Sequence, residues 1–317
     1  VTFPWVYGIL GLVLLGVVCV IGNTSYGAQL SLSFGGFTVQ PSEFVKISFV
    51  FFVAAMFYQS TDRETIIKTT VVAALHVLVL VLSKDLGSAL IFFVAYMTML
   101  FVATSSYLWF GAGIAGGSLA AVAAYYLFPH VRRRVEAWAD PWSDIANKGY
   151  QVAQALFAIG TGGWFGMGLY QGLPDKIPVV KQDFIFSAIS EELGGIFALC
   201  LIMVCFSCFL MFLNIAMQMK DQFYKLVALG LGTIYAFQVF LTIGGVTKFI
   251  PSTGVTLPLV SYGGSSLLSS MIIFAVIQGL YILRQDEGEI NASKSRKNRQ
   301  NRKKTTGFEN ADIEKLS

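Results

Sequence analysis

The chain has 317 residues, of which 55% are hydrophobic and only 13% are charged, and its formal net charge at pH 7 is +4. Soluble domains contain about 25% charged residues. This composition excludes a soluble globular domain and places the chain in a lipid bilayer. We expect no nucleic-acid partner.

Eight apolar stretches of about membrane-spanning length follow one another along the chain. Backbone groups in lipid must be hydrogen-bonded internally, which a helix achieves alone, whereas strands need a closed barrel of alternating apolar and polar residues. We find no such alternation. The sequence predicts an all-α polytopic membrane protein with eight transmembrane helices, at residues 5–21, 44–58, 66–82, 86–103, 107–128, 184–213, 226–244 and 267–283.

The two ends of the chain give the expected topology. No basic region with a cleavage site precedes the first apolar stretch, so we expect no signal peptide and a chain cut from a longer protein. Residues 285–317 are polar and rich in Lys and Arg, which predicts a disordered cytoplasmic tail after a membrane domain at 1–284. The expected outer loops are 23–43, 129–183 and 245–264; the expected inner loops are 59–65, 104–106 and 214–225.

The long extracytoplasmic loop at 129–183 carries more cations than the positive-inside rule allows for an outer loop. An anionic ligand outside the membrane would explain them, and the alternative is a solvated arginine face that touches lipid headgroups. Segment 151–159 is amphipathic, and the glycines after it predict tight turns, because no GxGxxG motif can be read there. The cations are Arg132, Arg133, Arg134, Lys148, Lys176 and Lys181.

A stretch reading "KQDFIFSAISEELGG" begins the sixth helix. If the helix includes Asp183, a rotation of 100° per residue places Ser187, Ser190 and Glu191 on its side and Glu192 on the other. The sequence therefore predicts a polar stripe that descends from the outer surface and faces a cavity, because carboxylates in lipid are costly. The alternative for Asp183 is a role as the helix N-cap.

Further polar residues are expected at the same outer level. In "QPSEFVKI", Pro41 starts a helix, and Glu43 lies three residues before Lys46, close enough to form a structural ion pair. Lys84 and Asp85 lie at the start of a helix, where they could either cap the helix or line the site. The last outer loop contains prolines, hydroxyl residues and two adjacent glycines, and such irregular backbone at membrane depth indicates a cavity lined by protein. Its residues of interest are Pro251, Pro258, Ser261, Gly263, Gly264 and Ser265.

Three cysteines, Cys200, Cys205 and Cys208, have the spacing of a plant-type iron–sulfur site. They lie inside one expected apolar helix, and the fourth cysteine, Cys19, is far away in sequence. We therefore interpret them as apolar filling and predict no metal site formed by protein ligands.

Five stretches together resemble the SEDS family, the FtsW, RodA and SpoVE proteins of bacterial division, elongation and sporulation. The resemblance spans residues 1 to about 284, and "KIPVVKQDFIFSAISEELGG" favours the division and sporulation branch. Ten transmembrane helices are expected for the family, so this chain lacks two of them. The stretches are "QPSEFVKI", "DLGSALIFF", "GYQVAQALFAIGTGGWFGMGL", "DFIFSAISEELGG" and "LPLVSYGGSS".

The resemblance implies a peptidoglycan glycosyltransferase of the bacterial cytoplasmic membrane that polymerises lipid II on the outer face. The family's catalytic aspartate corresponds to Asp183, although Gln182 stands where the family often has threonine or asparagine. The cations at 132–134 and Lys181 are candidates for binding the diphosphate of the undecaprenyl donor. Further substrate-binding candidates are Lys84, Asp85, Ser187, Glu191, Ser261 and Ser265, and expected structural residues are Pro41, Glu43, Lys46, Glu192, Gly263 and Gly264.

The resemblance also implies a class B penicillin-binding protein as the transpeptidase partner, within the divisome or the elongasome. No cofactor is required by the sequence, although Mg²⁺ or Mn²⁺ could assist the leaving diphosphate. Two other functions stay open, a lipid II flippase or transporter and a non-catalytic division scaffold. We find no internal repeat of the kind that transporters show, and a scaffold leaves the acids near Asp183 unexplained.

Overall fold

A computed structural model describes residues 3–25, 28–34 and 37–285 and confirms the predicted all-α membrane fold. Within these residues, eight helices are long and apolar enough to cross a membrane. They match the predicted helices, and the largest difference is the sixth, which continues to Gln218. The helices are α1 (Pro4–Ile21), α2 (Pro41–Gln59), α3 (Arg63–Leu82), α4 (Leu86–Thr104), α5 (Tyr107–Leu127), α8 (Ile185–Gln218), α9 (Gln222–Val246) and a last helix, Gly264–Gln285.

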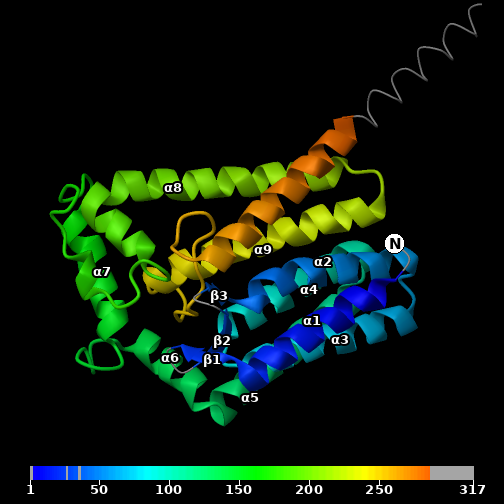
Figure 1. Ribbon diagram of the computed structural model, residues 1–317, viewed down its shortest axis with the longest axis horizontal. Helices are drawn as coiled ribbons and strands as arrows, with labels where there is room; N and C mark the ends of the chain where they lie inside the picture. Colours follow the sequence, from blue (N-terminus) through cyan, green and yellow to red (C-terminus); the bar gives the residue numbers. More distant parts are fainter. Residues whose placement is uncertain (1–2, 26–27, 35–36, 286–317) are drawn as a thin grey trace, which may run out of the picture.

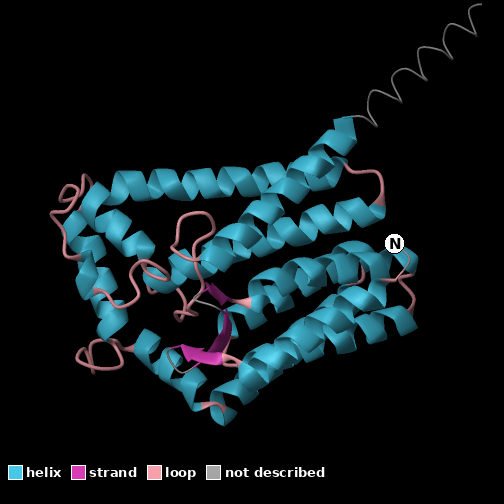
Figure 2. Cartoon of the chain, in the orientation of Figure 1, coloured by secondary structure: helices cyan, strands magenta, loops and turns pink. Residues whose placement is uncertain are grey.

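Shorter elements connect the spanning helices at one end of the bundle (Figures 1 and 2). An antiparallel sheet of order β1-β2-β3 follows α1, where only a loop at 23–43 was expected, and β2 has the alternating sequence AQLSLSF. α7 confirms the amphipathic segment, whereas the arginine-bearing α6 was expected as loop. The elements are β1 (Asn23–Ser25), β2 (Ala28–Phe34), β3 (Phe37–Val39), α6 (Pro129–Ala139), α7 (Tyr150–Gly162) and the 3-10 turn η1 (Pro174–Lys176).

Local chemistry explains where several helices begin. Pro41 and Pro129 occupy the first positions of α2 and α6, where a residue without an amide hydrogen costs nothing. Asp62 and Asp85 cap α3 and α4, since their carboxylates accept hydrogen bonds from the amides of Thr65 and Ser88, each at 3.1 Å.

The centre of the bundle is formed by α2, α4 and α9. Phe49 and Phe52 of α2, Phe92 of α4 and Leu231 of α9 are fully buried, whereas α5 has no buried residue. α1 and α8 expose long rows of apolar side chains, as a helix in lipid must.

Helix α8 is broken at Gly194, whose φ of 85° and ψ of 171° are not helical. The segment 163–173, which we name the strap, packs at this break. Amides of Met167 and Gly168 donate to the carbonyls of Glu191 and Glu192 at 2.9 and 3.0 Å. The break therefore leaves carbonyls unpaired in the helix, and the strap satisfies them.

A buried polar network links α2 to the C-terminal helices and confirms the predicted pair of Glu43 and Lys46. The Lys46 ammonium donates to Glu43 and, at 2.8 Å, to Gln238 Oε1 of α9. Ser269 of the last helix donates to Glu43 at 2.7 Å. The charge of Lys46 is thus compensated inside the membrane domain, as its low dielectric requires.

Candidate active site

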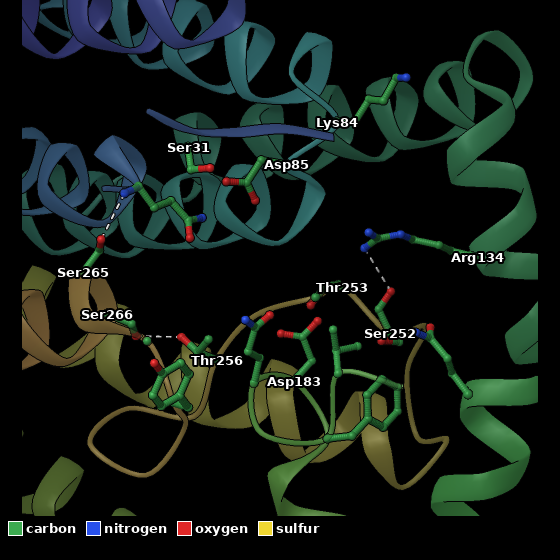
Figure 3. A pocket seen from close by; sticks show the side chains of 18 of the residues that line it. Ser31, Lys84, Asp85, Arg134, Asp183, Ser252, Thr253, Thr256, Ser265 and Ser266 are labelled. Atoms are coloured by element: carbon green, nitrogen blue, oxygen red, sulfur yellow. Dashed lines mark hydrogen bonds between the residues drawn. The ribbon is translucent and has the colours of Figure 1, made fainter. Parts of the chain in front are cut away.

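A cavity of about 880 Å³ opens at the end of the bundle that carries α6, α7 and the sheet. Segments distant in sequence meet there, since the Gln40 amide donates to Ser265 Oγ at 3.0 Å and the Tyr262 amide donates to the Lys181 carbonyl at 2.8 Å. Its polar lining includes Lys84, Asp85, Arg133, Arg134, Gln151, Gln182, Asp183, Thr253, Thr256, Ser265 and Ser266 (Figure 3).

Asp183 reaches this cavity from a turn that precedes α8. The turn passes through Val179, whose φ of 53° is left-handed, and the Asp183 amide donates to the Val179 carbonyl at 3.2 Å. The N-cap of α8 is Phe184, without a side-chain cap, so the N-cap interpretation of Asp183 is wrong. Its carboxylate is left free to face the cavity.

Arg134 enters the same cavity from α6. Its Nη1 donates to the Ser252 carbonyl at 3.2 Å, which fixes the guanidinium. A β-carbon placed on Gly254 would lie 3.4 Å from Asp183 Oδ2 and 3.6 Å from Arg134 Nη2. The carboxylate and the guanidinium therefore both lie next to this position. Within the described part of the chain, no ion pair closer than 4.0 Å joins them.

Asp85 is the second carboxylate of the cavity. It caps α4 through Ser88, accepts a hydrogen bond from Ser42 Oγ at 3.2 Å and lines the cavity, so both predicted roles hold. Its neighbour Lys84 has a left-handed φ of 64° and also lines the cavity. Figure 3 shows the side chains of Asp85, Asp183 and Arg134 arriving from three different elements.

Burial dominates the electrostatics of these groups. Desolvation raises the pKa of Asp183 to about 6, while the Arg134 charge opposes the rise and the Asp85 charge adds to it. Desolvation also raises the pKa of Asp85 and lowers the pKa of Arg134, although an arginine stays protonated. The cavity therefore combines a carboxylate that titrates near neutral pH with a fixed cation.

Only part of the predicted cation cluster lines the cavity. Arg133, Arg134 and Lys148 do, whereas Arg132 pairs with Glu136 at 3.5 Å and does not, and Lys176 does not line the cavity either. Lys181 is exposed beside the cavity and contributes its carbonyl to the Tyr262 contact.

The hydroxyl and glycine candidates of the last loop divide in the same way. Ser265, Gly263 and Gly264 line the cavity. Ser261 lies behind it, because its hydroxyl donates to the Gln182 carbonyl and accepts from the Leu257 amide at 2.8 Å. Ser261 thus holds the turn before Asp183 in place.

The predicted polar stripe on α8 is wrong. Ser187, Ser190 and Glu191 share a helix face, but the face is buried and none of the three lines the cavity. Glu191 accepts a hydrogen bond from the Leu173 amide, and Glu192 accepts one from the Tyr170 amide, both at 3.2 Å. The structure therefore does not place Ser187 and Glu191 in the cavity: Ser187 is fully buried in the bundle, Glu191 holds the strap, and Glu192 has its expected structural place.

Sequence reasoning missed several lining residues, among them Gln151, Thr253, Gly254 and Thr256. The sequence offered one signal, a glycine at position 254 in a loop bounded by Pro251 and Pro258, and the structure shows that this glycine has a left-handed φ of 74°. The described residues contain no group of three or more His, Cys, Asp or Glu side chains arranged to hold a metal ion, and Cys200, Cys205 and Cys208 are free thiols on α8.

A scan against known protein families matches residues 2–285 to the FtsW/RodA/SpoVE family of cell cycle proteins. The chain belongs to this family. It is accordingly a multi-pass membrane protein of the FtsW/RodA/SpoVE type, which confirms the resemblance carried by the five motifs.

Among the curated proteins similar to this chain are peptidoglycan glycosyltransferases named RodA and FtsW. A peptidoglycan glycosyltransferase RodA of Mycobacterium bovis is 35% identical over 294 residues, which cover 87% of this chain and 63% of the relative. A probable peptidoglycan glycosyltransferase FtsW of Aliivibrio salmonicida is 32% identical over 279 residues, covering 85% and 70%. The chain thus spans less than two thirds of the RodA relative, and the preference for the division and sporulation branch stays a prediction.

Solved structures of similar chains share the fold. A chain of a peptidoglycan synthase complex, described as coordinating polymerization and crosslinking, has a TM-score of 0.72 and 25% identity, covering 90% of this chain and 81% of that one. The rod shape determining protein RodA of Thermus thermophilus gives a TM-score of 0.61 at 23% identity, covering 87% and 76%.

Proposed function

We propose that this protein is a peptidoglycan glycosyltransferase that polymerises lipid II into β-1,4 glycan strands with inversion at the donor sugar. The observation that carries the proposal is the cavity in which Asp183, with a pKa of about 6, faces Arg134 across one small space. The names of the RodA and FtsW relatives support the same reaction.

The proposed chemistry needs one base and one cationic group. Asp183 accepts the proton of the acceptor 4-hydroxyl as its oxygen bonds to the anomeric carbon of the donor. The bond from that carbon to the diphosphate breaks, and the electron pair leaves with undecaprenyl diphosphate. Arg134 and Arg133 stabilise the charge that develops on the diphosphate, with Lys84 at the rim.

The orientation of the membrane domain follows from the same proposal. A lipid-linked donor presents its sugar at the membrane surface, and the cavity opens at one end of the bundle. The last helix ends at Gln285 at the opposite end, next to the basic tail, whose composition favours the cytoplasm. We place the cavity on the outer face of the cytoplasmic membrane and the C-terminus inside.

A divalent cation has no ligand set of its own in the described cavity. Both oxygens of Asp85 already accept hydrogen bonds, so Asp183 is the one cavity carboxylate among the described residues that remains available to a metal ion. Mg²⁺ or Mn²⁺ would therefore be held mainly by diphosphate oxygens and would neutralise their charge. We assign no step to a metal ion.

A transpeptidase partner completes the proposal. The similar solved chain belongs to a peptidoglycan synthase complex, and that complex is described as coordinating polymerization and crosslinking. We propose a class B penicillin-binding protein as the partner of this chain, within the divisome or the elongasome.

The test is polymerisation of lipid II by the full-length protein in proteoliposomes with its partner. Asp183→Asn is expected to lower the rate about 10²- to 10⁴-fold, because it removes the base while keeping the shape. Asp175→Asn is the matched control, since Asp175 is exposed on η1 and does not line the cavity. Lipid II transfer across the bilayer without polymer would instead indicate a flippase, and polymer from Asp183→Asn would refute the assigned base.

A further inference from the structure

Gly254 leaves an open space between the two charged groups of the cavity. A β-carbon there would lie 3.4 Å from Asp183 Oδ2, and 3.6 and 3.8 Å from Arg134 Nη2 and Nη1, all ordinary van der Waals distances. The residue is exposed and lines the cavity. We name this methyl-sized space, where the missing side chain would stand, the Gly254 notch.

The loop that forms the notch is firmly held. The carbonyl of Val255 accepts a hydrogen bond from Thr242 Oγ1, and the carbonyl of Thr256 accepts one from Gln238 Nε2, both at 3.0 Å and both from α9. The carbonyl of Ser252 binds Arg134. The position of the notch relative to the guanidinium is therefore set by the bundle, which suits a site that must be preorganised.

The charges on either side of the notch define what fits in it. Asp183 can accept a hydrogen and Arg134 can only donate, and the two form no ion pair within 4.0 Å. A group that joins them must donate to the carboxylate and accept from the guanidinium. An alcohol hydroxyl of the acceptor meets the first requirement, and a phosphate oxygen of the donor meets the second.

We propose that the Gly254 notch receives the attacking oxygen of the acceptor, and this inference rests on the proposed function. The acceptor hydroxyl oxygen lies in the notch with its hydrogen directed to Asp183. The leaving diphosphate oxygen lies on the opposite face of the anomeric carbon, with its phosphate within reach of the Arg134 guanidinium. As the new carbon–oxygen bond forms, the proton passes to Asp183 and the bond to the diphosphate oxygen breaks. Glycine is required because any side chain would occupy the path of attack.

The test uses a methyl group as the probe of the notch. Gly254→Ala places a carbon at van der Waals distance from both charged groups and displaces neither, yet it fills the space. We expect kcat for lipid II polymerisation to fall about 10²-fold, the loss that misplaced reacting groups cause. Gly254→Asn, which tolerates a left-handed backbone better, is expected to lose activity as well.

The matched control is Gly168→Ala in the strap. Gly168 has a φ of 101°, so alanine is strained there too, but its β-carbon would meet only Gln171 Cγ at 3.5 Å. The control is expected to shift the thermal midpoint of unfolding as Gly254→Ala does and to keep the wild-type kcat. If Gly254→Ala and Gly254→Asn keep the kcat of Gly168→Ala, the notch proposal is overturned while the proposed function stands. A wild-type protein without polymerase activity would overturn both.

Discussion

Asp183 owes its proposed role to an unusual balance of surroundings. A carboxylate that bonded Arg134 directly would be a weak base, whereas one buried without a cation would be protonated at neutral pH. Here burial raises the pKa of Asp183 to about 6, and Arg134 acts from a short distance against that rise. The result is a group that is mostly ionised at pH 7 and still able to take a proton.

Replacing Arg134 is expected to change the pH dependence of the reaction as well as its rate. Since Arg134 lowers the pKa of Asp183, Arg134→Gln raises that pKa further, and the acid limb of kcat/KM moves to higher pH. The rate falls by about 10²- to 10³-fold through lost stabilisation of the diphosphate. Arg132→Gln is the control on the same helix, because Arg132 pairs with Glu136 outside the cavity. An unshifted limb in Arg134→Gln would contradict the assigned contact.

Asp85 is expected to act with the opposite sign. Its charge raises the pKa of Asp183, so Asp85→Asn moves the acid limb of kcat/KM to lower pH. Asparagine also caps helices, so the cap on Ser88 survives and the thermal midpoint changes little. The measurement is kcat/KM for polymerisation as a function of pH, over a range that extends to both sides of pH 6. A limb that stays in place would show that Asp85 is already neutral when the enzyme works.

Single residues also show how far sequence alone reaches. Asp183 could be singled out from its motif, but the predicted stripe assumed that α8 included it. The helix begins at Ile185, so the rotation of 100° per residue cannot relate Asp183 to Ser187. The approach of Arg134 to Asp183 depends on how the loop folds back, and no local pattern encodes a contact across such a distance.

The break in α8 and the strap behave as one element. Helix α8 has 34 residues, about 51 Å at 1.5 Å per residue, which exceeds the roughly 30 Å of a hydrocarbon core. The break at Gly194 allows the first turns to stand apart from the spanning part, where they carry the strap and the turn of Asp183. Glu191 and Glu192 fix this arrangement with both their carbonyls and their carboxylates.

Filling the break is expected to destabilise the protein. A β-carbon on Gly194 would lie 2.4 Å from the Gly166 amide nitrogen, and its φ of 85° disfavours any side chain. Backbone strain of this kind typically costs about 1–3 kcal/mol of unfolding free energy. Gly194→Ala should cost more than this, because the clash with Gly166 adds to the strain. The control is Gly160→Ala on α7, where a β-carbon would meet no heavy atom within 4 Å apart from its chain neighbours and the nearby backbone of its own helix. Equal thermal midpoints for the two variants would show that the strap does not depend on the break.

Element prediction succeeded where periodic burial or long apolar runs dominate and failed elsewhere. The eight spanning helices follow from apolar length, since lipid leaves the backbone no other choice. α6 was missed because three consecutive arginines interrupt the apolar residues of 129–139, a pattern also typical of solvated loops. The sheet was missed because its strands are only three to seven residues long.

The whole molecule places its cavity between parts that come from opposite ends of the chain. Early lining residues meet residues from the last third of the chain: Ser31, Thr38, Gln40, Lys84 and Asp85 meet Ser252, Thr253, Gly254, Thr256 and residues 262–266. Gln238 connects this lining to the membrane interior, because it accepts from Lys46 and donates to Thr256, a residue of the cavity wall. The buried network is therefore expected to support the shape of the cavity as well as the packing of α2 on α9.

Removing Lys46 tests this support. The side chains of Lys46 and Glu43 are only 4% and 8% exposed, so Lys46→Met leaves a buried carboxylate without its cation. This variant should lose about 3–5 kcal/mol of unfolding free energy. Lys68→Met removes an exposed pair with Glu64 on α3, at exposed fractions of 52% and 73%, and should cost about 0.3–0.5 kcal/mol. The measurement is thermal unfolding in one detergent.

A double variant separates the lost ion pair from a simple packing defect. If the cost of Lys46→Met comes from the uncompensated carboxylate of Glu43, then Glu43→Gln combined with Lys46→Met should recover part of the thermal midpoint, because the amide carries no charge. If it comes from packing alone, the two losses should add. The cavity gives a second readout, since loss of the Lys46 contact releases Gln238 and hence Thr256. Polymerisation should therefore fall in Lys46→Met at temperatures where the protein is still folded, and unchanged activity there would show that the network supports only the bundle.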